Sequence, residues 1–361
     1  MGREAKLLNP SVILGEASLH WAKTTTIGLD TEFVRERTFF PQPGLVQVCD
    51  GNRVWLIDAV VENPFKELAE MLDRSNTIKV LHSVGEDLEI FRILAGTLPQ
   101  PLFDTQMAAA ILGFPLQVRY ENLVERCFDV CLPGGKARSN WCARPLASEL
   151  LEYAAQDVIW LPRLHDYLNE ALLAHQRLHW LQEDCQRVVE VAKTDNEGVQ
   201  PLFKVKGAGR LEDEALAWLL QLVHWRDQQA KARDVPRSFV VKDETLTETA
   251  ARLVRAGPVE NALSALPPGL QRRHGDRLLK WLEESGPAQG FQRPAELQSP
   301  SQAQRAWLKQ AQQHVRNQAE RLQIDPALIA SKRELSRLAR GEQPDWLNGW
   351  RSEPLHGLPE P

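Results

Sequence analysis

The hydrophobic pattern of the first 110 residues predicts a meander of three strands. Apolar or alternating runs occupy residues 25–34, 44–50 and 53–60, and short links rich in Gly, Pro, Asn and Asp separate them. Runs of this length between turn residues are typical of strands that are paired by hairpins. We therefore expect these segments to form an antiparallel part of a sheet.

Helical spacing begins after the third of these runs. Residues 63–74 start close to a Pro and place apolar residues at helical intervals, and a strand-like run at 77–83 and a helical pattern at 85–96 follow. Residues 101–106 indicate one more short strand, and helical spacing continues to about residue 192. The order of elements predicts an α/β fold, in which helices flank a mixed sheet.

The composition changes twice in the rear half of the chain. Residues 193–210 and 284–302 are rich in Gly, Pro, Ser and Gln, as interdomain linkers commonly are. The patterns between and after them are helical. We therefore expect an α/β domain over residues 1–195 and two small all-α domains over residues 208–288 and 300–361.

The overall composition excludes several classes of protein. The chain has 43% hydrophobic and 25% charged residues, and no apolar run approaches the roughly 18–20 residues that span a bilayer. The first residues lack the apolar core of a signal peptide, so we expect a cytoplasmic protein. The five cysteines form no C-x-x-C pair, which argues against a disulfide framework and a zinc ribbon.

The net charge of −5 is unevenly distributed. Residues 1–200 contain 19 Lys and Arg against 28 Asp and Glu, whereas residues 201–361 contain 24 against 20. An acidic front half and a mildly basic rear half suit a metal-dependent site joined to modules that approach an anionic partner. Ordinary scatter of surface charge explains the same numbers.

Two carboxylates interrupt the first strand-like run. Asp30 and Glu32 are two residues apart, so a strand would present both on one face. Adjacent buried anions repel each other, and a divalent cation between them would remove that cost. The alternative is a surface strand with two solvated acids.

Three further polar residues stand at positions that could join this pair. Asp87 falls in the first turn of a predicted helix that follows a strand, where open sheets place their ligands. Tyr153 and Asp157 are four residues apart and share one face of a helix. Taken singly, these residues also fit a helix cap and a buried hydrogen bond.

Together the four acids could hold two hard cations. Mg²⁺ and Mn²⁺ prefer carboxylate and water oxygens, and two such ions about 3.5–4 Å apart can act on both the attacking and leaving oxygens of a phosphodiester. Tyr153 could orient, and partly deprotonate, the water that attacks phosphorus.

The segments 29–33 (LDTEF), 81–91 (LHSVGEDLEIF) and 153–158 (YAAQDV) resemble the three ordered motifs of the DEDDy 3′–5′ exonucleases. The wider surroundings over residues 20–170 are similar to the ribonuclease D family. The resemblance implies a ribonuclease H-like fold and hydrolysis from RNA 3′ ends with release of 5′-nucleoside monophosphates. It also implies two divalent ions, Mg²⁺ or Mn²⁺, held by Asp30, Glu32, Asp87 and Asp157, with Tyr153 as the catalytic tyrosine.

The resemblance suggests nucleic-acid contacts near these motifs. Phe33 follows the first acid pair, where the family packs the terminal nucleotide, and His82 and Arg144 could touch phosphates. Trp141 lies in a segment that the family keeps before the third motif. Each of these four residues has a structural alternative, and for Asp104 we expect a structural hydrogen bond rather than a metal contact.

Residues 222–250 resemble an HRDC domain, and residues 324–351 are similar to a second such domain in the ribonuclease D family. The first copy carries Arg226, Lys231 and Arg233 in one segment, where they could contact phosphates without reading sequence. A solvated helix face is the alternative. We see no aromatic platform for stacking bases in this half of the chain.

The leading interpretation is a monomeric 3′–5′ exoribonuclease that acts on tRNA precursors with 3′ extensions and other small structured RNAs. Two alternatives remain open from the sequence. One is the same chemistry on DNA, and the other is a catalytically silent RNA-binding protein on a nuclease scaffold.

Overall fold

The computed structural model describes residues 6–8, 10–60, 66–136, 138–194, 200–255, 258–264 and 266–360. The predicted meander is confirmed, because β2 (Thr26–Val34), β3 (Gln42–Cys49) and β4 (Val54–Asp58) are consecutive antiparallel neighbours. The turn residues between the three runs therefore do form hairpin connections.

The predicted helix-and-strand alternation also holds. α2 (Lys66–Asp73) leads to β5 (Ile78–Leu81), and α3 (Asp87–Ala95) leads to β6 (Leu102–Asp104). β5 lies parallel to β2, and β6 lies parallel to β5. The six strands follow the order β1-β4-β3-β2-β5-β6, which confirms an α/β fold with a mixed sheet.

The amino-terminal elements were not predicted. β1 (Lys6–Leu8) adds a strand parallel to β4 at one edge of the sheet, and α1 (Pro10–Trp21) follows it. The apolar residues of α1 do not fall on a single stripe, so its sequence lacks the amphipathic spacing that marks a surface helix.

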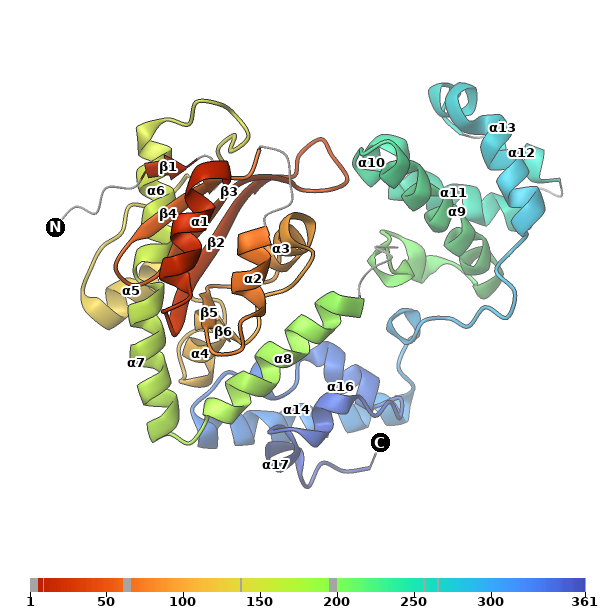
Figure 1. Ribbon diagram of the computed structural model, residues 1–361. Coiled ribbons are helices and arrows are strands. Elements are labelled where there is room, and N and C mark those ends of the chain that lie inside the picture. Colours follow the sequence, from red (N-terminus) through yellow and green to blue (C-terminus); the bar gives the residue numbers. More distant parts are fainter. Residues whose placement is uncertain are drawn as a thin grey trace.

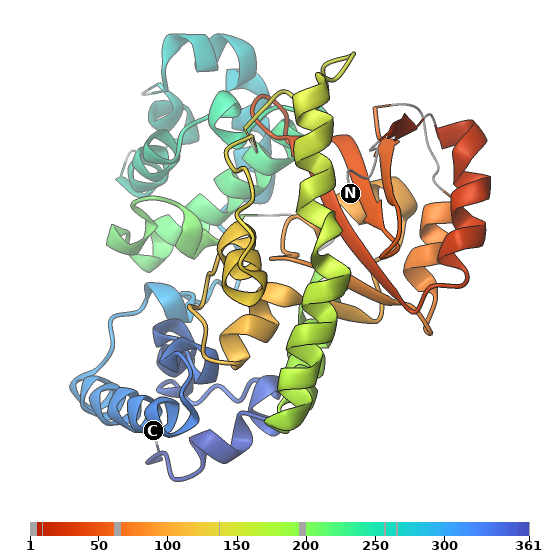
Figure 2. The same ribbon diagram turned by 90° about the vertical axis from the view of Figure 1, so that its left-hand side faces the viewer.

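Helices cover both faces of the sheet (Figures 1 and 2). α1, α2 and α3 share one buried apolar cluster with β2 and β3. The opposite face is crossed by α6 (Ser148–Ile159) and α7 (Leu161–Ala174), which follow each other as one long rod in Figure 2. The remaining helices of this α/β domain are α4 (Thr105–Ile111), α5 (Tyr120–Phe128) and α8 (Leu178–Thr194).

A first helical module follows α8 and has a core of its own. It consists of η1 (Leu202–Lys204), η2 (Ala208–Arg210), α9 (Asp213–Ala232), α10 (Arg237–Val240), α11 (Asp243–Arg255), α12 (Val259–Leu263) and α13 (Pro268–Ser285). Within the predicted linker 193–210, Leu202, Val205 and Ala208 are buried in this core, and residues 195–199 lie outside the described part. The described end of that linker therefore belongs to the module.

A second helical module closes the chain. It contains η3 (Ala295–Leu297), α14 (Gln302–Leu322), α15 (Pro326–Ile329), α16 (Lys332–Leu338), η4 (Asp345–Asn348) and α17 (Ser352–Leu355). Its apolar side chains form one continuous cluster with α4, α7 and α8. Trp350 stacks on Trp180 of α8 at 4.3 Å between ring centroids, and Arg351 pairs with buried Asp184 through two hydrogen bonds of 2.6 and 2.9 Å.

None of the described helices is long and apolar enough to cross a membrane.

Candidate active site

The close approach of a helix to β2 brings the site together. A Cβ added at Gly28 would lie 2.8 Å from Cβ of Leu161 and 3.1 Å from the carbonyl oxygen of Val158. Only a glycine therefore lets the junction of α6 and α7 pack this tightly on the strand. Asp30 and Glu32 follow on the same face of β2, so they point toward the helix that carries Asp157.

A cavity of about 240 Å³ lies where these elements meet. It is lined by Leu29, Asp30, Thr31, Glu32, His82, Tyr120, Glu121, Tyr153, Asp157 and Leu161. Three of the four predicted metal ligands and the predicted tyrosine therefore share one cavity, although they come from two distant parts of the sequence.

The carboxyl groups of the cavity resist ionisation in the absence of a cation. Burial, followed by the charges of Asp157 and Asp87, raises the pKa of Glu32 to about 9. Burial and the surrounding acids hold the pKa of Asp30 well above its usual range. Burial and Glu121 raise the pKa of Asp157 to about 7. Buried carboxyl groups whose pKa values are raised by burial and by neighbouring acids form a site that attracts positive charge.

Asp87 stands at the first position of α3, as predicted, but it does not line the cavity. Its Oδ1 accepts a hydrogen bond of 2.5 Å from the hydroxyl of Thr31, the residue between the two acids of β2. Burial raises the pKa of Asp87 to about 7, and its charge in turn raises the pKa of Asp30 and Glu32. Asp87 thus lies close to the pair and is held by Thr31.

The chemistry of these donors fits a divalent cation. The described lining contains four carboxylates and no Lys or Arg, so no basic side chain of that lining other than His82 stands beside them. Mg²⁺ and Mn²⁺ are bound in proteins through such oxygen ligands. Among the described residues, no three Asp, Glu, His or Cys side chains already converge tightly enough to hold a metal.

Tyr153 lies in the cavity as a hydrogen-bond donor to Asp157. Burial and the charge of Asp157 raise the pKa of its phenol, so the hydroxyl keeps its proton at neutral pH. A hydrogen bond from Tyr153 lowers the pKa of Asp157, which opposes part of the effect of burial. The two roles expected for Tyr153, orientation and partial deprotonation of the attacking water, both stay predictions.

Two residues of the cavity were missed by the sequence analysis. Glu121 is the fourth carboxylate of the lining, and Tyr120 donates a hydrogen bond of 3.0 Å to the carbonyl of Gln156 beside Asp157. Both stand at the start of α5, outside the three motifs. An acidic residue at the first turn of a helix is common, so no sequence signal separates Glu121 from a dipole-stabilising residue.

His82 lines the cavity, but protein atoms occupy both of its ring nitrogens. Nδ1 lies 2.9 Å from the Thr105 hydroxyl, and Nε2 lies 3.0 Å from the Val118 carbonyl. Burial lowers the pKa of His82, so the ring is neutral at physiological pH. Asp104 has the structural role expected of it, because it caps α4 through the backbone N–H groups of residues 106 and 107.

The structure corrects the roles expected for Trp141 and Arg144. The Trp141 side chain is fully buried beside β3 and α6, so it has no face to offer a nucleic acid. The Arg144 guanidinium forms two hydrogen bonds with Asp58, of 2.7 and 2.5 Å, and three more with backbone carbonyls. Both residues therefore stabilise the packing of the loop before α6 on the sheet. Phe33 is half-buried and packs against the α1–α3 layer.

The basic residues expected to contact RNA differ in their surroundings. Arg226 is buried and donates hydrogen bonds to Asp243, Gln200 and the Val241 carbonyl, so its role is structural and the expected phosphate contact is wrong. Arg233 is exposed and lies 3.1 Å from Nε2 of His274. Lys231 is half-buried and stands 5.9 Å from the Phe39 ring of the α/β domain.

Comparison with known proteins agrees with the geometry. Residues 9–173 match the family model described as 3′–5′ exonuclease, and residues 215–281 match the HRDC domain. The chain is 35% identical to ribonuclease D of Pseudomonas paraeruginosa, over 97% of this chain and 95% of that protein. It is 36% identical to ribonuclease D of Xanthomonas oryzae, over 92% of each chain.

A solved structure supports the same assignment. The crystal structure of Escherichia coli RNase D, described as an exoribonuclease involved in structured RNA processing, superposes with a TM-score of 0.85. The match covers 99% of this chain and 98% of that chain at 29% identity. With the acidic cavity, the exonuclease and HRDC matches and full-length relatives, the chain belongs to the ribonuclease D family of 3′–5′ exoribonucleases.

Proposed function

We propose that this enzyme removes nucleotides from the 3′ ends of tRNA precursors and other small structured RNAs, releasing 5′-nucleoside monophosphates. Dependence on a divalent cation is a property of the exonuclease family. The proposal adds that two ions, Mg²⁺ or Mn²⁺, are held by Asp30, Glu32, Asp87 and Asp157. The observation that carries it is the cavity in which carboxyl groups with raised pKa values meet without any basic side chain.

When bound, the cations would supply charge stabilisation for the phosphoryl oxygens and a more acidic water. The residues of the chain do the positioning. The acids of β2 and α6 fix the ligand oxygens on rigid elements, and Thr31 keeps Asp87 beside them. Tyr153, which remains protonated, donates a hydrogen bond within the cavity and so can orient the attacking water.

The two helical modules extend the enzyme beyond its catalytic domain. The HRDC match of residues 215–281 suggests nucleic-acid binding by the first module. We propose the functional division 1–195, 208–288 and 300–361, with the helical parts holding structured RNA while its 3′ tail enters the catalytic cavity. We further propose that the enzyme is a cytoplasmic monomer.

The test is digestion of a tRNA carrying an extended 3′ tail, with and without Mg²⁺, Mn²⁺ or EDTA. Products resolved by length and end chemistry should shorten stepwise from the 3′ end and consist of 5′-monophosphates. A DNA oligonucleotide of matched sequence addresses the DNA alternative, and equal or faster cleavage of DNA would contradict the proposed substrate.

A further inference from the structure

A second cavity, of about 980 Å³, lies between the exonuclease domain and the first helical module. One wall consists of residues 35–40, which follow β2, together with part of α3. The other wall consists of residues 200–206 and parts of α9, α10 and α11. In Figure 1 the loop between β2 and β3 extends toward α10, and residues of this loop, which follows the strand that carries Asp30 and Glu32, line the cavity.

The charge of this cavity is opposite to that of the catalytic one. Its described lining contains eight basic and four acidic side chains, although the whole chain has a net charge of −5. The basic residues are Arg35, Arg92, Lys204, Lys206, Arg226, Lys231, Arg237 and Lys242. A basic hollow beside an acidic nuclease site favours a polyanion as its occupant.

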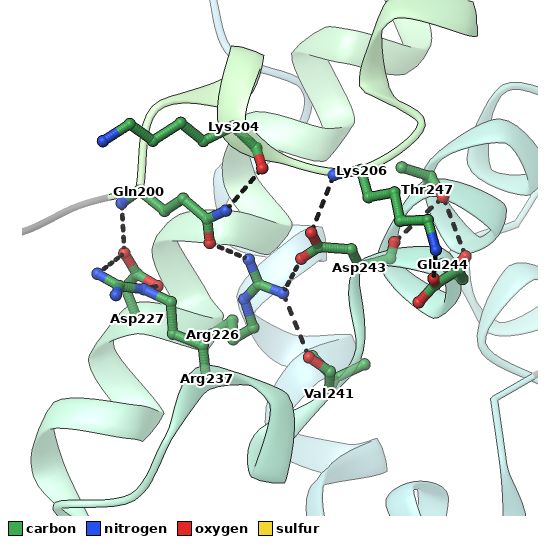
Figure 3. Close-up of polar contacts among 10 residues, drawn as sticks. All are labelled: Gln200, Lys204, Lys206, Arg226, Asp227, Arg237, Val241, Asp243, Glu244 and Thr247. Carbon is green, nitrogen blue, oxygen red and sulfur yellow. Dashed lines mark hydrogen bonds and ion pairs between the residues drawn. The ribbon is translucent and has the colours of Figure 1, made fainter. Parts of the chain in front are cut away.

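Two of these cations hold the wall in place. Asp243 accepts hydrogen bonds from Arg226 at 2.6 Å and from the backbone N–H of Lys206 at 2.9 Å. Asp227 accepts in the same way from Arg237 at 2.7 Å and from the backbone N–H of Gln200 at 2.6 Å. Figure 3 shows these two networks side by side. The backbone of residues 200–206 is thus fixed before any ligand arrives.

The lysines carried by this wall remain available. Neither Lys204 nor Lys242 forms an ion pair with a described carboxylate, and Figure 3 shows the Lys204 side chain extending away from the network. Lys206 pairs with Glu244 at 2.8 Å, but both side chains are largely exposed, so this pair costs little to open. Three ammonium groups can therefore meet phosphates.

The opposite wall supplies aromatic rings. The Phe40 side chain is 43% exposed and meets Phe39 edge to face at 5.0 Å between ring centroids. The backbone N–H groups of Phe39 and Phe40 donate hydrogen bonds of 2.9 and 3.0 Å to Oδ1 of Asp234, just beyond the C-terminal end of α9. These hydrogen bonds keep the two aromatic rings close to basic side chains of the helical module. No aromatic platform was expected, because the rings and the lysines are distant in sequence.

We propose that this cavity binds the single-stranded RNA that precedes the nucleotide being removed, with phosphates on Lys204, Lys206 and Lys242 and a base on Phe40. A basic groove with an exposed ring is the usual arrangement for a single strand. Arg35 lies three residues beyond Glu32, about 10 Å along the strand direction, so RNA leaving the catalytic cavity reaches this groove within a short distance. The inference rests on the proposed exoribonuclease function.

The test measures binding of full-length protein in EDTA to a labelled 12-nucleotide single-stranded RNA and to a dinucleotide. The Lys204→Gln, Lys242→Gln double variant should bind the 12-mer about tenfold more weakly at 0.1 M salt, and its salt-dependence slope should fall by about 1.4. Phe40→Leu should weaken 12-mer binding by at least about fivefold. Dinucleotide affinity should not change. Lys280→Gln, an exposed lysine of α13 outside the cavity, is the matched control.

Unchanged 12-mer affinity and salt slope in the double variant would overturn the inference, as would an equal loss for the dinucleotide or for Lys280→Gln. A loss confined to a duplex of the same length would assign this face to structured RNA and would also overturn it. Hydrolysis of the 12-mer by the unaltered enzyme with Mg²⁺ is measured in parallel. Failure of that reaction counts against the proposed function, whereas failure of the binding test counts only against this groove.

Discussion

Replacing Glu32 with Gln is expected to stabilise the metal-free enzyme while it abolishes hydrolysis. The Glu32 side chain is 8% exposed, and burial with the charges of Asp157 and Asp87 raises its pKa from 4.5 to about 9. Folding at neutral pH without metal therefore requires this carboxyl to take up a proton that the unfolded chain has released. Glutamine has a similar shape and no charge, so it avoids that cost.

The size of the effect follows from the shift. A pH of 7 is about 2.5 units above the pKa of this carboxyl in the unfolded chain. At about 1.36 kcal/mol per unit, the proton uptake on folding therefore costs about 3 kcal/mol. Because the folded pKa is the raised one, this cost is absent below about pH 4.5 and grows until about pH 9. For a domain of about 200 residues, 3 kcal/mol corresponds to roughly 6–12 °C in melting temperature.

Differential scanning calorimetry in EDTA at pH 5 and pH 8 measures this difference. Glu32→Gln should melt above the unaltered protein at pH 8, and the gap should narrow at pH 5. Added Mg²⁺ should narrow it at pH 8, because a bound cation neutralises the native acids. Glu152→Gln, at an exposed position of α6, is the control and should leave the melting temperature unchanged. A variant that melts at or below the unaltered protein at pH 8 would refute the reasoning.

Three further substitutions test other parts of the fold. Asp87→Asn should abolish Mg²⁺-dependent hydrolysis while leaving RNA binding in EDTA within about twofold by anisotropy, since its effect on binding is limited to one buried group; wild-type turnover would show that the metal assignment is wrong. Gly28→Ala should destabilise the α/β domain by about 1–3 kcal/mol in urea unfolding and lower the hydrolysis rate, because its Cβ would push α6 from β2; an unchanged rate would contradict the packing argument. Arg351→Ala should cost about 3–5 kcal/mol by leaving Asp184 buried without its main partner, whereas Arg321→Ala, at an exposed pair, should cost less than about 1 kcal/mol.

The catalytic geometry could be predicted where it depends on local periodicity. The spacing of Asp30 and Glu32 on a strand, and of Tyr153 and Asp157 on a helix, determines which side chains share a face. The convergence of these two elements depends on the space left by Gly28, which no periodicity reveals. The position of Asp87 at the start of α3 was predicted, but its hydrogen bond to Thr31 depends on tertiary packing.

Exposure of charged side chains was the least predictable property. Arg226 looked like one of several surface cations, yet the fold buries it against Asp243 and Gln200. Arg144 is fully used by Asp58 and backbone carbonyls. Asp58 is remote from Arg144 in sequence, and Asp243 and Gln200 lie outside the helix that carries Arg226. Local composition therefore gives no indication of these pairings. Conversely, Phe39 and Phe40 meet the helical module through tertiary contacts, which include the hydrogen bonds from their backbone N–H groups to Asp234.

The shared core of the exonuclease domain and the second helical module also has a consequence for the first module, which lies between them in sequence. That module begins after α8 and ends before α14, and both of these helices pack in the same apolar cluster. Both ends of the first helical module are therefore connected to one body, which consists of the exonuclease domain and the second helical module. If the hydrogen bonds to Asp234 opened, two short tethers would keep the module at a high effective concentration near its docking site, and re-closure would be an intramolecular event.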